Sequence, residues 1–259
     1  MKTIHLVVFF FLATFSCFSN VSVVNGLTHM HSGSSGDVIT GEVILVNYGT
    51  VPERVTFSIE DAIYDCEKPR IFSEKVSHAL SSASWVTNHV NEKVLAPKEE
   101  YVLKYTIAVP KNAELSGSYW SVLMVSVERP IREESVHQNI GLDTKIQYAV
   151  GLITNVNTAD SVQIDFADVL SPGKEDKSLE VKIKNNGQFV EATTLTLEVY
   201  NQEGEKVKEY ATKRLLVFPS VCRAYKLNIS DLPNGEYECV LVAEARESFI
   251  GANLKLQID

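Results

Sequence analysis

The chain contains one short β pattern twice, at a constant spacing. Residues 43–49 (VILVNYG) recur as residues 181–187 (VKIKNNG), and residues 55–60 (VTFSIE) recur as residues 193–198 (TTLTLE). The copies are separated by 138 residues throughout. A chain of 259 residues is long enough for two domains of ordinary size. The duplication therefore predicts two domains of common design.

Apolar and polar side chains alternate along most of the chain with the period of two that indicates β-strands. Turn-forming Gly, Asn and Pro residues separate these segments, and residues 65–95 are predicted to form a long loop. About seven short strands per half predict an all-β protein of two tandem immunoglobulin-like β-sandwich domains. The expected strands are 40–47, 55–61, 101–109, 119–127, 146–156, 162–169, 179–184, 193–200, 225–229, 237–244 and 254–258.

Residues 1–26 are predicted to be an export signal peptide. Lys2 is the positive end, residues 4–18 are the apolar run, and Val24-Asn25-Gly26 is a small-residue cleavage site. That run is too short to span a bilayer, and no later segment is apolar enough to do so, so no transmembrane anchor is expected. A lipid anchor at Cys17 is an alternative, although the bulky Phe15 makes a poor lipidation motif. The protein is therefore expected in the periplasm or at the cell surface.

The predicted mature chain is acidic. Loss of Lys2 with the signal leaves 23 of the 24 Lys and Arg residues against 33 acidic residues, a net charge of −10. Such a surface argues against a nucleic acid partner and against anionic membranes.

The first domain is predicted to cover residues 27–157 and the second residues 158–259. The strand at 146–156 is assigned to the first domain, which otherwise lacks a closing strand. In the second domain, Tyr237 follows Gly235 and precedes Cys239 by two positions, as in the corner that leads into strand F of immunoglobulin-like folds. Its hydroxyl is expected to bond back to the nearby backbone.

Three cysteines remain after the signal: Cys66, Cys222 and Cys239. In an oxidising compartment, a Cys222–Cys239 disulfide is one prediction, with Cys66 left over. The alternative is that all three are small buried hydrophobic residues.

The order of motifs along residues 27–259 resembles the exported proteins of the WxL-interacting type and their Bacteroidetes relatives. It includes Trp85, Pro97, Gly117-Ser118-Tyr119-Trp120 and Leu232-Pro233-x-Gly235-x-Tyr237. The resemblance implies a peptidoglycan-binding-like domain followed by a second immunoglobulin-like domain. More distantly, the chain resembles periplasmic pilus chaperones, which also carry two such domains after a signal peptide.

No catalytic or cofactor motif is present in the sequence, so no enzyme and no cofactor are expected. His29 and His31 would share one face of a strand and could hold a metal ion only with a third ligand, for which His78 and His89 are the candidates. Because these histidines are not clustered in the sequence, no metal site is predicted.

Two candidate binding surfaces remain. Trp85, Tyr119 and Trp120, with Tyr48, are either a buried cluster or a flat aromatic surface on which a sugar ring or a partner chain stacks. The row Ile146, Tyr148, Val150 and Leu152, beside Lys145, either closes its own domain or pairs with a partner strand.

The sequence therefore predicts an exported, non-enzymatic protein that binds a cell-wall polymer or an envelope or surface protein. The alternative is a periplasmic chaperone that captures secreted subunits by β-strand addition. That mechanism calls for a basic group in the interdomain cleft, for which Lys145, Arg129 and Arg132 are the nearby candidates in the sequence.

Overall fold

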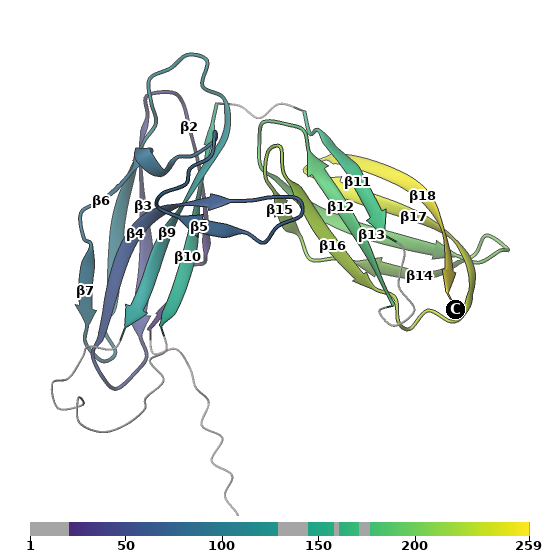
Figure 1. Ribbon diagram of the computed structural model, residues 1–259, viewed down its shortest axis with the longest axis horizontal. Helices are drawn as coiled ribbons and strands as arrows, with labels where there is room; N and C mark the ends of the chain where they lie inside the picture. Colours follow the sequence, from purple (N-terminus) through teal and green to yellow (C-terminus); the bar gives the residue numbers. More distant parts are fainter. Residues whose placement is uncertain (1–20, 129–144, 158–160, 171–176, 259) are drawn as a thin grey trace, which may run out of the picture.

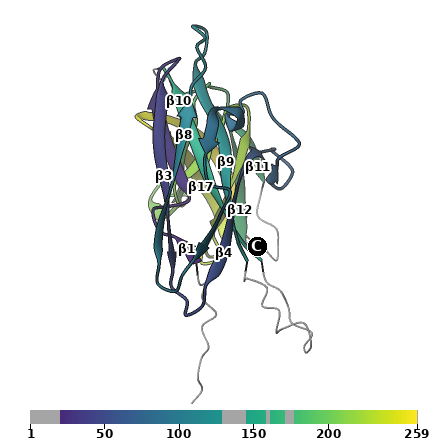
Figure 2. The same ribbon diagram turned by 90° about the vertical axis from the view of Figure 1, so that its left-hand side faces the viewer.

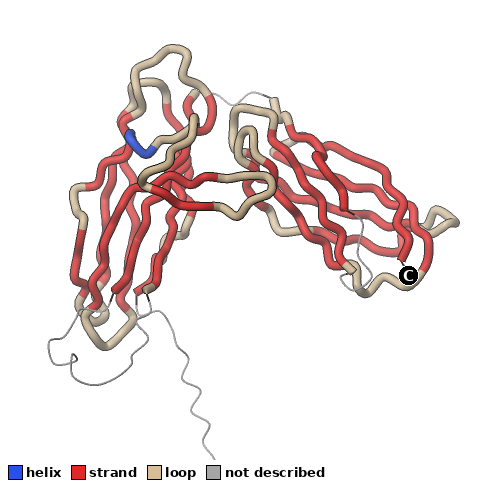
Figure 3. The backbone as a smooth tube through the Cα atoms, in the orientation of Figure 1, coloured by secondary structure: helices blue, strands red, loops and turns tan. Residues whose placement is uncertain are grey.

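The computed structural model describes residues 21–128, 145–157, 161–170 and 177–258 of the chain. These residues form two β-sandwiches that lie at an angle to each other, and the elements are almost all strands (Figures 1 and 3). The fold class predicted from the duplicated pattern, two tandem immunoglobulin-like sandwiches, is confirmed. The predicted export signal and Cys17 lie mostly outside the described residues, as do Arg129 and Arg132.

The first domain packs two sheets face to face (Figure 2). One sheet has the order β1-β3-β8-β6 and the other β2-β10-β9-β4-β5, with β7 also paired to β4. A single turn of 3-10 helix, Ala83–Trp85, precedes β6. The strands are β1 (Val21–Val23), β2 (Thr28–Gly33), β3 (Val38–Asn47), β4 (Glu53–Ile63), β5 (Ile71–Ser73), β6 (Val86–Asn88), β7 (Glu92–Leu95), β8 (Glu100–Ala108), β9 (Gly117–Glu128) and β10 (Ile146–Val156).

The second domain has sheets of the order β11-β12-β16 and β14-β13-β17-β18, with β15 also paired to β13. Its strands are β11 (Ile164–Leu170), β12 (Ser178–Asn185), β13 (Glu191–Tyr200), β14 (Lys206–Ala211), β15 (Leu215–Val217), β16 (Cys222–Asn228), β17 (Gly235–Ala245) and β18 (Ser248–Ile258). Each domain has its own apolar core, formed by the alternate side chains that point between its sheets.

The repeated motif performs the same structural task in both domains. The buried Asn47 side chain donates from Nδ2 to the carbonyls of Val51, Leu95 and Ala96, and its Oδ1 accepts from the Gly49 N–H. Asn185 does the same with Phe189, Val217 and Gly187. Each asparagine thus satisfies backbone groups of a turn that the β-ladders leave unpaired.

The tyrosine corner is also formed, since the Tyr237 hydroxyl donates to the Pro233 carbonyl at 3.0 Å.

Two expectations need correction. Residues 65–95 are not one long loop, because β5, the 3-10 turn, β6 and β7 lie within them. The first domain also does not begin at residue 27. Val21 of β1 is 0% exposed, and its carbonyl accepts the Tyr148 hydroxyl at 2.7 Å. The sequence pattern does not distinguish this short strand, because its apolar residues continue directly from the apolar run of the predicted signal.

A chain that begins at residue 27 should be less stable than one that begins at residue 20. Loss of β1 exposes the core under Val21 and removes the acceptor of the Tyr148 hydroxyl, at a cost of about 3 kcal/mol. Urea unfolding of the two chains measures the difference. Equal midpoints would mean that β1 contributes nothing to the first sandwich.

Asn185→Ala should destabilise the second domain by about 2 to 4 kcal/mol, because it leaves buried backbone groups without partners. Asn253→Ala, on the exposed side of β18, is the matched control and should change stability little. Denaturant unfolding measures the free energy of unfolding of both variants. If Asn185→Ala were as stable as the control, Asn185 would not have this role.

Candidate functional site

A third apolar cluster lies between the two domains. Trp120 is 5% exposed, donates from its indole N–H to the Ala62 carbonyl at 2.8 Å, and meets Phe218 of the second domain with ring centroids 4.8 Å apart. Tyr64 stacks on the same Phe218 at 4.2 Å. Val122, Met124, Ile153 and Val190 complete the buried part of this cluster, together with Ala62. The outer face of the β9 sheet is therefore covered by the second domain.

Backbone contacts fix the same interface. The Ser118 N–H donates to the Gln188 carbonyl at 2.8 Å, and the Val190 N–H donates to the Ser118 hydroxyl at 2.7 Å. A Cβ at Gly117 would lie 2.7 Å from the Gln188 carbonyl oxygen, and the Gly117 φ is +109°, so only glycine fits there. The start of β9 thus docks directly against the loop between β12 and β13.

A disulfide joins Cys66 to Cys222 and crosses between the domains. The predicted Cys222–Cys239 pairing is therefore wrong. Cys239 lies in the core of the second domain as a free thiol, and burial raises its pKa to about 11. Cys222 lies instead on β16, where the β4–β5 hairpin of the first domain reaches the second (Figure 1). Sequence alone carries no information about which of three cysteines meet in space.

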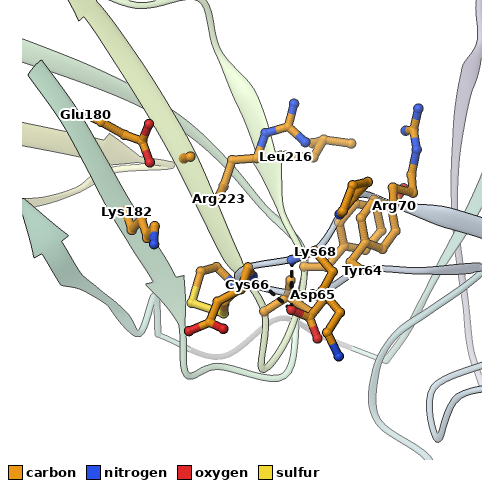
Figure 4. A pocket seen from close by; sticks show the side chains of 15 residues that line it. Tyr64, Asp65, Cys66, Lys68, Arg70, Glu180, Lys182, Leu216 and Arg223 are labelled. Carbon is orange, nitrogen blue, oxygen red and sulfur yellow. Dashed lines mark hydrogen bonds between the residues drawn. A yellow bond between two sulfur atoms is a disulfide. The ribbon is translucent and has the colours of Figure 1, made fainter. Parts of the chain in front are cut away.

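Beside the disulfide, two adjoining cavities occupy the interdomain cleft. The larger has a volume of about 500 Å³ and is lined by both cysteines and by Arg70 and Arg223, which Figure 4 shows with Tyr64 and Leu216. The smaller, of about 240 Å³, is lined by Arg70, Arg214 and Arg223 and by apolar residues of both domains. The two cavities share Arg70 and Arg223, so they form one continuous cleft.

The three arginines are available for a ligand. Among the described residues, none of their guanidinium groups forms an ion pair, whereas Arg246 binds Glu191 and Arg54 binds Glu92. Arg70 stacks on the Phe72 ring at 4.8 Å, and Arg214 donates from Nε to the Ala192 carbonyl at 3.1 Å. An arginine fork without a carboxylate is a ready site for one.

Acidic residues lie only in the larger cavity, as far as the described lining shows. Asp65, Glu67 and Glu180 line it together with Lys68 and Lys182. Asp65 accepts the backbone N–H groups of Glu67 and Lys68, which lowers its pKa. Among the described residues that line the smaller cavity, the charged ones are Arg70, Arg214 and Arg223.

The smaller cavity lies at an edge of the β10 sheet. Leu27 and Thr28 line it together with Ala149, Gly151 and Ile153 of β10. β2 runs parallel to β10 but pairs with it only from Gly151 to Val156, so the first half of β10 extends past the start of β2.

The alternation of a strand determines which backbone groups of β10 point to that edge. The Gly151 N–H donates to the Leu27 carbonyl on the β2 side, so the N–H groups of Ala149 and Gln147 point the same way. Neither group has a backbone partner there among the described residues. Ala149 also lines the smaller cavity.

The predicted strand-pairing side chains point elsewhere. Val150 and Leu152 are fully buried in the first core, Ile146 and Tyr148 pack against it, and Lys145 pairs with Glu128 at 3.0 Å. Their row therefore closes its own domain. At this edge of β10, the backbone N–H groups can pair with another strand, whereas these side chains cannot contact it.

Of the two alternatives for the aromatic residues, a buried cluster or an exposed surface, Trp85 and Trp120 are buried, although in two different clusters. Trp85 is 9% exposed and packs against Tyr119 at 4.6 Å in the first core, while Trp120 lies in the interdomain cluster. Tyr48 is exposed but is distant in the fold from these rings, in the turn after β3. Neighbouring residues of β9 point to opposite faces, which separates Tyr119 from Trp120.

The histidines do not assemble a metal site. His29 and His31 both lie 3.0 Å from the Tyr105 hydroxyl, His78 stacks on Trp120 at 4.3 Å, and His89 is exposed. Among the described residues, no group of three His, Cys, Asp or Glu side chains is placed to hold a metal ion. Burial raises the pKa of Tyr105 to about 12, so its hydroxyl stays protonated between the two rings.

Arg70, Arg214 and Arg223 were not identified from the sequence. They lie on the β4–β5 hairpin, just before β15 and on β16, and nothing in their spacing connects them. Only the docking of the two domains brings them to one cavity.

Comparisons with known protein families and with curated proteins give no match to this chain. Solved structures do resemble it. The YadV chaperone is 12% identical, with 92% of this chain and 100% of that chain covered and a TM-score of 0.49.

Two further structures are complexes. The SafB chaperone with the SafA pilin from Salmonella enterica is 13% identical, covers 90% of this chain and 96% of that one, and has a TM-score of 0.47. The CsuC–CsuE chaperone–tip adhesion subunit complex from Acinetobacter baumannii is 12% identical and has a TM-score of 0.47. The match covers 80% of this chain and 90% of that chain. The likeness to these structures concerns the fold alone. The resemblance to the WxL-interacting type stays a prediction.

In the part of the chain that the structure describes, no helix is both long and apolar enough to cross a membrane.

The interdomain cluster should make stability fall in mild acid. Burial lowers the pKa of His78 below its ordinary value of 6.5, despite the opposing effect of Asp61 at 3.4 Å. As the pH falls below 6.5, the unfolded chain takes up a proton that the folded site resists, so the free energy of unfolding decreases. His31, whose pKa is also lowered by burial, acts in the same direction.

Urea unfolding at pH 7.5 and pH 5 tests this dependence. His78→Phe, which keeps the ring against Trp120, should lose less stability between the two pH values than the original chain. His89→Phe, at an exposed position, is the control. An unchanged pH dependence in His78→Phe would assign the effect to other groups.

Proposed function

We propose that this protein is a non-enzymatic binding protein that holds an extended segment of a partner protein in its interdomain cleft. The partner segment adds as a strand beside the first half of β10. Its C-terminal carboxylate occupies the smaller cavity and is bound by Arg70, Arg214 and Arg223.

The observation that carries the proposal is the set of three arginines in one cavity, with no ion pair and no acidic lining residue in the part of the chain that the structure describes. Arg70 and Arg214 are exposed and Arg223 is partly buried, so their guanidinium groups are accessible to an anion in the cleft. The neighbouring side chains are apolar, notably Phe72, Leu216 and Phe218. A peptide with apolar side chains and a C-terminal carboxylate fits this lining, because the carboxylate binds the arginines and the apolar side chains contact the apolar residues.

The edge of β10 supplies the rest of the binding site. The backbone groups of Gln147 and Ala149 face that edge, and the cavity lies at its end, beside Gly151 and Leu27. A strand whose last residue reaches the cavity must run parallel to β10, in line with β2. Backbone hydrogen bonds then provide affinity with little dependence on sequence, and the carboxylate determines the register.

The partner is accordingly a protein with an accessible apolar C-terminal strand, such as a subunit that is exported before it assembles. Two of the solved structures named above contain partners of this general kind, a pilin beside SafB and a tip adhesion subunit beside CsuC. The geometry of the cleft, rather than that likeness, supports the proposal. The expected location is the periplasm or the cell surface, where the Cys66–Cys222 disulfide is stable.

Recognition of a cell-wall polymer has less support. It depended on an exposed aromatic surface, and Trp85 and Trp120 are buried.

A synthetic peptide tests the arginine site. An N-acetylated peptide of alternating apolar residues should bind about tenfold more tightly with a free carboxylate than with a C-terminal amide, because it gains charge-assisted hydrogen bonds. Arg70→Gln/Arg223→Gln should abolish this preference. Isothermal titration calorimetry or NMR shift titration measures both affinities.

Arg54→Gln is the matched control, since Arg54 pairs with Glu92 at the far end of β4. It should keep the preference for the free acid. Equal affinity for acid and amide in the original chain, or an equal loss in the control, would contradict the proposal.

A further inference from the structure

The interdomain disulfide lies directly beside the arginine site. Cys66 is in the loop of the β4–β5 hairpin, four positions before Arg70, and Cys222 immediately precedes Arg223 on β16. Both cysteines line the same cavity as the two arginines, as Figure 4 shows. The covalent bond therefore joins the two segments that carry the arginines on opposite sides of the cleft.

The other contacts of the hairpin with the second domain lie at its base, where Tyr64 and Phe72 pack in the interdomain cluster, and not at its tip. Tyr64, at the base of the loop, stacks on Phe218, and the Cys222 N–H donates to the Cys66 sulfur at 3.0 Å. Asp65 bonds only within the loop, and Arg70 stacks on Tyr64 and Phe72 of its own hairpin. Residues 67–70 are exposed. The disulfide is thus the main tie between the tip of this hairpin and β16.

We expect both domains to fold without this disulfide. Neither Cys66 nor Cys222 belongs to the core of either sandwich, whereas each core closes on its own apolar residues. The interface also keeps the Trp120–Phe218 contact and the hydrogen bonds of Ser118 when the bond is absent. Loss of the disulfide should therefore release the hairpin loop and leave both domains folded and docked.

We propose that Cys66 and Cys222 are positioning residues of the arginine site, and that oxidation assembles this site while reduction disables it. This inference rests on the proposed function and adds its regulation. With the bond closed, Arg70 and Arg223 face one cavity together with Arg214. With the bond open, the loop before Arg70 is free to move, and Arg70 is held at the cleft only by its stacking on Tyr64 and Phe72, so the carboxylate loses a fixed position for one of its three cations.

The chemistry is thiol–disulfide exchange. The thiolate of one cysteine attacks a sulfur of a donor disulfide, forms a mixed disulfide and releases one donor thiol. The second cysteine then attacks the mixed disulfide, closes the Cys66–Cys222 bond and releases the second donor thiol. Two electrons and two protons pass from the protein to the donor, and a dithiol reductant reverses the step.

The peptide probe with a free carboxylate, and its amide, test the inference on the full chain. The oxidised protein should prefer the acid about tenfold, and the same protein under a dithiol reductant should prefer it less than threefold, since ordering a free loop again costs affinity. Cys66→Ser/Cys222→Ser should behave as the reduced protein under both conditions. Cys239→Ser, which changes only the buried thiol, should respond to the reductant as the original chain does.

A double-mutant cycle separates positioning from general stability. In the oxidised chain, Arg70→Gln should lower the acid preference. In the Cys66→Ser/Cys222→Ser background it should cause no further loss, whereas Arg223→Gln should still do so. Circular dichroism of the double serine variant should retain the folded signal, so that a loss of binding is not a loss of structure.

The outcomes distinguish the two proposals. An equal preference for the acid in oxidised and reduced protein would overturn the redox inference and leave the arginine site in place. No preference for the acid in any form, the oxidised one included, would overturn the arginine site itself. A further loss from Arg70→Gln in the serine background would show that Arg70 stays positioned without the disulfide, which also overturns the inference.

Discussion

The apolar cluster between the two sandwiches is the interaction on which the cleft depends. Trp120 reaches Phe218 across the interface, and Ser118 joins the backbones of both domains through the Gln188 carbonyl and the Val190 N–H. An interface that is both apolar and hydrogen-bonded resists the free rotation expected of tandem domains. Because the domains are held in one arrangement, three arginines from separate segments line one cavity.

Duplication explains the domains but not the cleft. Asn47 and Asn185 make equivalent hydrogen bonds, and each sandwich buries its own set of alternating side chains. The two copies differ where they meet. The first contributes a long hairpin with Cys66 in its loop, and the second contributes Cys222 and Arg223 on β16. The proposed binding site is thus made of features that the repeat does not share.

From the sequence alone, each row of apolar side chains could be interpreted either as part of a core or as a binding surface. Ile146, Tyr148, Val150 and Leu152 follow the strand period, and burial assigns them to the core of the first domain. Trp120 lies on the opposite face of β9 from Tyr119, as strand geometry requires, and its apolar row is covered by the second domain. Periodicity identifies a face, but it does not tell whether that face meets solvent, its own domain or a neighbouring one.

The sequence by itself determined the all-β class, the two sandwiches, the asparagine turns and the tyrosine corner. These follow from alternation and turn residues, which act over a few positions of the chain, and from a repeat that can be read directly by comparing two segments of the sequence. Only the tertiary structure decided the pairing of Cys66 with Cys222, the place of β1 in the first core and the gathering of Arg70, Arg214 and Arg223. Those features join residues far apart in sequence, and their distances depend on how two folded domains pack, which no local pattern records.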